Sequence, residues 1–205
     1  VRALRGAAGR SATFGYFLLL GAGFMVLEIG FLQKLILYLA HPIYSAAVAI
    51  AAFLVFAGVG SQISTRRWAS PRRIMLLAGG AVAGLSLLYV FVLDGWFALT
   101  QMCPLSVRVL IAAGTIAPLA LAMGHMFPTG LRAVGGSRPA LIPWAWAVNG
   151  FASVAATAAA PLLAMEIGFR RLTLLAVGCY ALAALLARFL PGIASTTEAQ
   201  REEDG

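Results

Sequence analysis

Glu28 is the residue with the clearest chemical potential, because it is an acidic residue in the middle of a long apolar run. An ionised carboxylate is costly inside a bilayer, so such residues usually face a bundle interior or a wet cavity. Two interpretations are open: Glu28 binds a cation or a proton, or it is a protonated carboxyl group hydrogen-bonded inside the bundle. On a helix it shares its face with Gly21, Phe24 and Met25. Lys34, about 9 Å further along and some 240° around the axis, is expected to snorkel toward the membrane surface.

A second polar group lies near the start of a later apolar run, where Asn149 and Ser153 are one helical turn apart. Thr157 follows after another turn. Side chains of this kind form helix–helix hydrogen bonds in membranes, each worth about 1 kcal/mol or less. The more specific alternative is that these side chains line a path for a solute.

The two histidines, His41 and His125, raise the question of a haem or pigment, since histidine is the usual axial ligand. The expected helices place them at opposite membrane surfaces, about 30 Å apart, which argues against a haem held between both. Capping or interfacial hydrogen bonding is favoured for each, and ligation of a pigment by a single histidine is left open. Phosphate-binding loops, nucleophile elbows, zinc spacings and cofactor fingerprints are absent from the sequence. We therefore expect no catalytic residue, no metal and no cofactor.

The composition decides the class of protein that must position these side chains. Of 205 residues, 61% are hydrophobic and 11% are charged, with a mean hydropathy of +0.92. A soluble domain carries about 25% charged residues, so a water-soluble enzyme is excluded. The apolar runs are near 20 residues long, enough to cross a bilayer as helices, and they are continuous rather than alternating, which excludes barrel strands.

The sequence predicts an all-α integral membrane protein with a bundle of about six transmembrane helices. A basic cytoplasmic segment covers residues 1–12, a six-span membrane domain residues 13–190, and a polar tail, expected to be disordered, residues 191–205. Pro118 and Pro161 fall inside spans, where they are expected to kink the helix or free carbonyl groups. The expected spans are Thr13–Leu39, Pro42–Ile63, Ile74–Leu93, Val107–Phe127, Pro143–Ile167 and Leu172–Leu190.

The basic residues predict the orientation. With both termini in the cytoplasm, eleven bases lie inside and four outside, namely Lys34, Arg108, Arg170 and Arg171. This bias obeys the positive-inside rule and suits a multi-pass protein of the bacterial inner membrane. We therefore assign the net charge of +8 to orientation against anionic lipid rather than to nucleic acid.

One cytoplasmic loop concentrates this charge: Arg66, Arg67, Arg72 and Arg73 surround Pro71. Its expected partner is the anionic lipid surface. The following span contains Gly80-x-x-x-Gly84, a helix-contact pattern. Packing within the bundle is favoured over a dimer interface, because the pattern is common by chance in spans rich in alanine and glycine.

Two stretches resemble a known family. Residues 17–61 contain GFMVLEIGFLQK, and residues 123–132, MGHMFPTGLR, precede PWAWAVNGFASV at 143–154. Both are similar to the membrane half of bacterial membrane-bound, or transporter-fused, spermidine/spermine synthase-like proteins. The resemblance implies transporter-like helices beside an aminopropyltransferase-like domain, with Glu28, Gln33, Lys34 and Asn149 at the family's polar positions. Six spans with a basic loop after the second also match one repeat of the major facilitator architecture, at the level of the fold.

This sequence departs from the family in two respects. His125-Met126 stands where the family usually has a proline, and no strand followed by a glycine-rich turn and an acidic residue exists here to hold a nucleoside cofactor. Aminopropyl transfer is therefore not expected of this chain, which we predict is not an enzyme.

Two functions are expected from different classes. The first is a non-enzymatic membrane module that handles or senses a small cationic or amphiphilic solute around Glu28, with a separate synthase-like subunit as a candidate partner. The alternative is an accessory structural subunit of a larger respiratory or photosynthetic membrane complex. A solute site requires a cavity beside the Glu28 carboxylate, whereas a structural subunit would have Glu28 sealed and paired.

Overall fold

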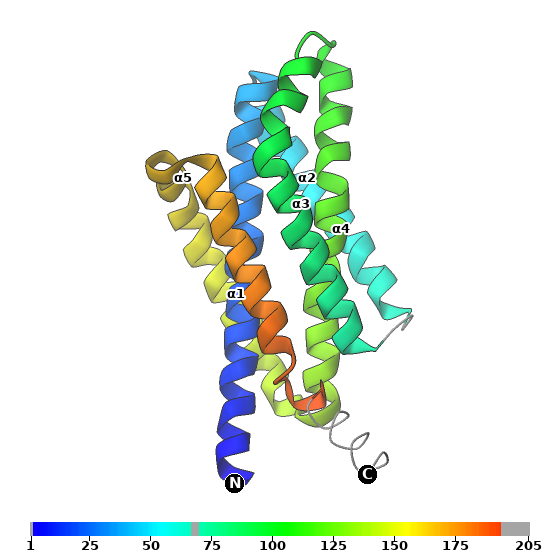
Figure 1. Ribbon diagram of the computed structural model, residues 1–205, viewed down its shortest axis with the longest axis vertical. Coiled ribbons are helices and arrows are strands. Elements are labelled where there is room, and N and C mark those ends of the chain that lie inside the picture. The colour runs from blue at the N-terminus through cyan, green and yellow to red at the C-terminus, as the bar shows by residue number, and fades with distance from the viewer. Residues whose placement is uncertain (1, 67–69, 194–205) are drawn as a thin grey trace.

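A computed structural model describes residues 2–66 and 70–193 (Figure 1). The described part is entirely helical, which confirms the predicted all-α class, with five long helices in place of the six separate ones expected. The helices are α1 (Arg2–Leu39), α2 (Pro42–Thr65), α3 (Pro71–Thr100), α4 (Leu105–Ser137), a short 3-10 turn (Pro139–Leu141) and α5 (Ile142–Ala187). Proline starts α2 and α3, where its missing N–H would have no intrahelical partner.

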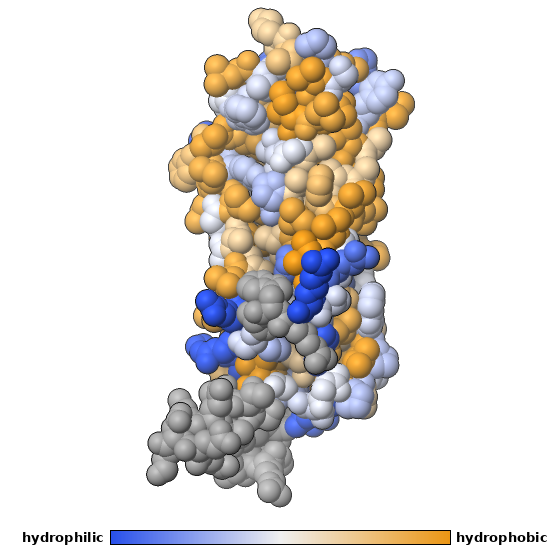
Figure 2. All heavy atoms as spheres, turned by 90° about the vertical axis from the view of Figure 1, so that its right-hand side faces the viewer, coloured by the Kyte–Doolittle hydropathy of each residue, from blue (hydrophilic) through white to orange (hydrophobic). Residues whose placement is uncertain are grey.

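All five long helices meet the length and hydropathy required to cross a membrane. Large apolar side chains such as Leu54, Phe91 and Phe151 are exposed on the outside of the bundle, where a water-soluble protein would aggregate. Figure 2 shows this apolar surface over the upper part of one face, with hydrophilic residues gathered lower down. The chain is a multi-pass membrane protein by these criteria.

Helix α5 is broken at Gly168, whose φ of 75° and ψ of 166° are not helical. A straight helix of 46 residues would be about 69 Å long, twice the thickness of the hydrocarbon core. Instead the chain reverses at Gly168, giving a first arm (142–167) and a second arm (169–187) that run in opposite directions (Figure 1). The two arms correspond to the predicted fifth and sixth spans.

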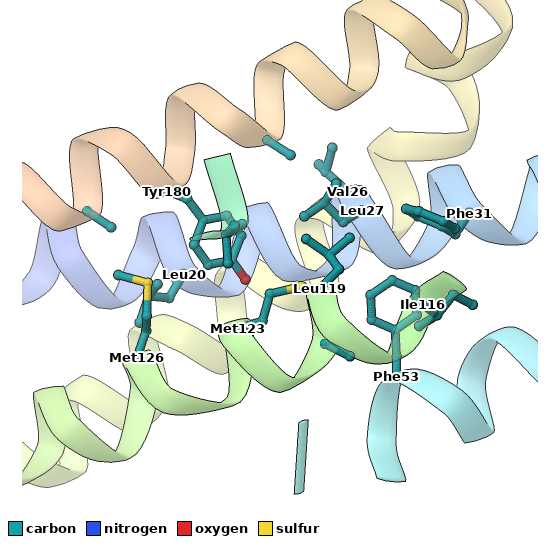
Figure 3. Packing of buried hydrophobic residues seen from close by; sticks show 14 of the residues in the cluster. Leu20, Val26, Leu27, Phe31, Phe53, Ile116, Leu119, Met123, Met126 and Tyr180 are labelled. Atoms are coloured by element: carbon teal, nitrogen blue, oxygen red, sulfur yellow. The ribbon is translucent and has the colours of Figure 1, made fainter. Parts of the chain in front are cut away.

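The central helix of the bundle is α1. In its most apolar window 56% of the residues are buried, against 22 to 33% in the other four helices. The first arm of α5 lies parallel to α1 and the second antiparallel to it, while α2 and α4 close the remaining sides. Figure 3 shows Leu20, Leu27 and Phe31 of α1 among Phe53 of α2 and Leu119 of α4.

Helices α2 and α4 cross at two glycines and run in the same direction (Figure 1). A Cβ on Gly60 would collide with the backbone of Leu121, and a Cβ on Gly124 would collide with the backbone of Ala57. The contact is therefore reciprocal and requires glycine on both helices, as in small-residue crossings of transmembrane helices.

The structure extends the predicted elements at both ends. Helix α1 begins at Arg2, so the segment expected before the first span is a continuation of that helix. At the other end the packed chain continues past residue 190, since Ile193 is buried and Gly192 lies against the backbone of Ala133. The remainder of the predicted tail lies outside the described residues. Helix α4 continues through Pro118 and Pro128, and the first arm of α5 through Pro161.

The reversal at Gly168 leads to a prediction. Replacing Gly168 with alanine should destabilise the protein by about 1–3 kcal/mol, because an L side chain rarely adopts this backbone conformation. Gly178→Ala in the second arm is the matched control, since its added Cβ would meet nothing within 4 Å, and it should be neutral or stabilising. Unfolding in mixed micelles measures both, and equal stabilities would show that the reversal does not depend on glycine.

Candidate functional site

A cavity of about 700 Å³ lies between α1, α2, α4 and both arms of α5. Its walls are mostly apolar, with four wholly polar side chains and one polar atom each on Trp146 and Tyr180. The polar ones are Glu28, Ser61, Asn149 and Ser153. The others include Leu20, Phe24, Met25, Leu54, Met123, Phe127, Trp146 and Tyr180.

Glu28 lies in the wall of this cavity with 6% of its surface exposed. Its helix face also carries Gly21, Phe24 and Met25, which line the same cavity, as the 3.6-residue period predicts. Within the described part of the chain no hydrogen bond or ion pair is formed by the Glu28 carboxyl group. A buried polar group of this kind normally has a partner. The cavity therefore offers an unpartnered carboxyl group to a molecule that enters it.

Asn149, Ser153 and Thr157 form a ladder between the first arm of α5 and α1. Asn149 Nδ2 donates to the Phe17 carbonyl (3.0 Å), Ser153 Oγ donates to the Gly21 carbonyl (3.4 Å), and Thr157 Oγ1 lies 2.9 Å from Met25 Sδ. Successive contacts are one turn apart on both helices, as parallel helices require.

The close approach along this ladder depends on Gly21. A Cβ at Gly21 would collide with the backbone of Asn149. The predicted helix–helix hydrogen bonds are therefore confirmed. Asn149 and Ser153 also line the cavity, and a path for a solute along them stays a prediction.

Lys34 has an acidic partner that was not predicted from the sequence. Its ammonium group forms an ion pair with Asp94 of α3 and lies 5.3 Å from the centre of the Phe169 ring. Arg170 approaches the second oxygen of Asp94 at 3.8 Å. The pair joins α1, α3 and the turn of α5, and the structure places Glu28 in the cavity and Lys34 outside it.

Asp94 is the residue of this cluster that the sequence interpretation missed. The sequence did offer an indication: Asp94 directly follows the expected span Ile74–Leu93, at the membrane surface where Lys34 and Arg170 were also expected. Gln33, half-buried next to Lys34, does not line the cavity. Trp146 and Ser61 were also not predicted for the site, because nothing local to them indicates which neighbouring helix they face.

The histidines lie apart from the cavity wall and from each other. His41 occupies the N-cap of α2 but its side chain makes no capping hydrogen bond, and its ring packs edge-on against Tyr44 at 5.6 Å. Of the two roles expected of His41, a side-chain cap is thus not formed, and interfacial hydrogen bonding stays a prediction. His125 Nδ1 lies 2.8 Å from the Leu121 carbonyl on its own helix. Over the described residues, no three metal-ligating side chains come together.

The basic loop and the glycine pattern can also be located. Arg66, Arg72 and Arg73 are exposed at the end of the bundle where α2 stops and α3 starts, and Arg67 lies outside the described residues. The prediction that Gly80 and Gly84 pack within the bundle is wrong. Both are exposed, and an added Cβ would meet nothing within 4 Å at either. The neighbouring Gly79 packs inward, against Ala184.

The Lys34–Asp94 pair leads to a prediction on stability. Asp94→Asn should destabilise the protein by about 1 kcal/mol, because it leaves a partly buried ammonium group without its carboxylate, while half of Asp94 is exposed to screening. A double-mutant cycle with Lys34→Met isolates the pair, and the double variant should lose less than the sum of the single losses. Strict additivity would mean that the pair contributes nothing.

Comparison with known proteins gives no family model, no curated protein and no solved structure that matches the chain.

Proposed function

We propose that this chain is a non-enzymatic module of a bacterial inner membrane, with both termini in the cytoplasm, that binds a small cationic amphiphile in the cavity beside Glu28. The observation that carries the proposal is the Glu28 carboxyl group, buried in the wall of a cavity of about 700 Å³ with no partner among the described residues. A cation is the ligand that such a group favours, since a charge in an apolar site needs an opposite charge.

The remaining walls favour a ligand with an apolar body. Phe24, Phe127 and Trp146 surround the space, and Phe127 and Trp146 pack edge to face at 4.7 Å. Aromatic faces attract organic cations, and the apolar residues accept alkyl or aryl groups. The volume falls within the roughly 300–1,000 Å³ typical of small-molecule sites.

The position of the opening supports an amphiphile over a fully hydrophilic solute. Helix α2 and the first arm of α5 have no extended contact with each other, and Leu54 and Trp146, on these two helices, line the cavity while being largely exposed. A molecule dissolved in the bilayer can therefore enter between these helices without crossing water.

The resemblance to spermidine-synthase-like proteins extends the proposal to a partner. A separate synthase-like subunit would supply or consume a polyamine-related cation, and this module would hold or sense it. The polar positions that carry the resemblance include Glu28 and Asn149, both of which line the cavity.

Replacing Glu28 with glutamine tests the proposal. The Glu28→Gln variant should bind a lipophilic cation such as tetraphenylphosphonium about tenfold or more weakly, because the ion pair of the complex is lost. Glu166→Gln is the matched control, since Glu166 is exposed on α5 outside the cavity, and it should bind as the unmodified protein does. Equilibrium dialysis in detergent measures both affinities, and unchanged binding by Glu28→Gln would overturn the proposal.

The second candidate is an accessory subunit of a larger respiratory or photosynthetic complex. The observation in its favour is the smooth, exposed face of α3 at Gly80 and Gly84, which would let a helix of another protein approach closely. Gentle extraction followed by mass spectrometry of co-migrating proteins separates the two functions. Stoichiometric redox or pigment proteins would favour the subunit, whereas the chain alone or with a synthase-like protein would favour the solute module.

A further inference from the structure

The start of α4 carries positive charge that nothing in the described chain balances. The helix begins after Pro104, its N-cap makes no side-chain hydrogen bond, and its first turn contains no acidic residue. Free N–H groups and the helix dipole make this end positive. Arg108, close to this end of the helix, adds a full positive charge where an anion would be favourable.

Arg108 itself is held in place without an acidic partner. Its guanidinium lies 5.0 Å from the centre of the Tyr38 ring, and that ring is fixed by stacking on Phe97 at 4.1 Å. The buried Nε atom has no hydrogen-bond partner. Asp94, the acidic residue near the end of α3, is already engaged by Lys34 and Arg170.

A groove of about 360 Å³ lies between α3 and α4, and on α4 it begins one helical turn after Arg108. Ile111 and Thr115 of its lining follow Arg108 by three and seven residues, so they share its side of α4. Leu88, Val92 and Trp96 form the α3 side and are exposed.

The interior of this groove is suited to hydrocarbon. The Tyr89 hydroxyl donates to the Thr115 carbonyl at 2.6 Å. Because this hydroxyl already has a hydrogen-bond partner, it does not require water in the groove. Leu88 and Trp96 are separated by about 12 Å along α3, which gives the groove the elongated form of a lipid chain. Gly114 leaves one side open, since a Cβ there would meet nothing within 4 Å.

We propose that Arg108 and this groove together seat one anionic phospholipid. The phosphate group lies at the start of α4 and accepts hydrogen bonds from the Arg108 guanidinium, while an acyl chain fills the groove between α3 and α4. Charge and polarity match this ligand: a cation near a helix N-terminus precedes, on the same side of α4, an apolar groove that begins one turn later at Ile111, just as a negative headgroup precedes its acyl chain. This site is separate from the cavity at Glu28 and does not depend on the function proposed for it.

Native mass spectrometry with phosphatidylglycerol and phosphatidylcholine tests the site. Arg108→Gln should weaken retention of phosphatidylglycerol by about tenfold, through the loss of a charge-assisted contact, whereas Arg171→Gln, an exposed base of α5 outside the site, should not. Gly114→Leu should also weaken retention, because the side chain occupies the groove. Gly80→Leu is its matched control, being an exposed α3 glycine with equal space around it.

The outcomes separate the alternatives. Loss of phosphatidylglycerol in both site variants, with phosphatidylcholine weaker throughout, supports the proposal. Loss in Arg108→Gln alone overturns the seated chain, and loss in neither overturns the site. Displacement of the lipid by glycerol phosphate at equal concentration would identify a free anion as the ligand and would also overturn it. If Arg108→Gln does not fold, Arg108→Lys is used in its place, because it keeps the charge and removes the guanidinium. Gly114→Leu still tests whether an acyl chain fills the groove.

Discussion

The carboxyl group of Glu28 cannot face hydrocarbon without a large cost in free energy, and the arrangement around α1 meets this constraint. The two arms of α5 lie along α1 in opposite directions, and α2 and α4 close the other sides. The reversal at Gly168 lets one continuous stretch of chain provide two of these walls. The result buries Glu28 among the helices while leaving a cavity beside it.

Close helix contacts and the cavity arise from the same residues. Gly21 lets α1 approach Asn149, and Gly124 lets α4 approach α2, yet both glycines also line the cavity. Removing side chains at these positions brings the backbones together on one side and leaves space on the other. The same positions therefore determine the helix packing and the shape of the cavity, and the polar atoms of Asn149 and Ser153 contribute to both.

Much of the fold could be predicted from the sequence, because hydropathy and helical period are local properties. They indicated the spans, the break near residue 168 and the face that Glu28 shares with Phe24 and Met25. Hydropathy and helical period could not predict which residues pair between helices, such as Lys34 of α1 with Asp94 of α3. The small-residue pattern likewise did not reveal that Gly60 and Gly124 are buried at a crossing while Gly80 and Gly84 are exposed, because a spacing of glycines does not identify the face that a partner covers.

The most direct test of the central claim is to locate a bound cation in the cavity. Crystals of the protein grown with tetraphenylarsonium would give an anomalous difference signal from the arsenic atom. We expect one peak between α1, α2, α4 and α5, beside the Glu28 carboxyl group, and we expect it to be lost in Glu28→Gln. A peak outside this cavity, or one equally strong in the variant, would contradict it.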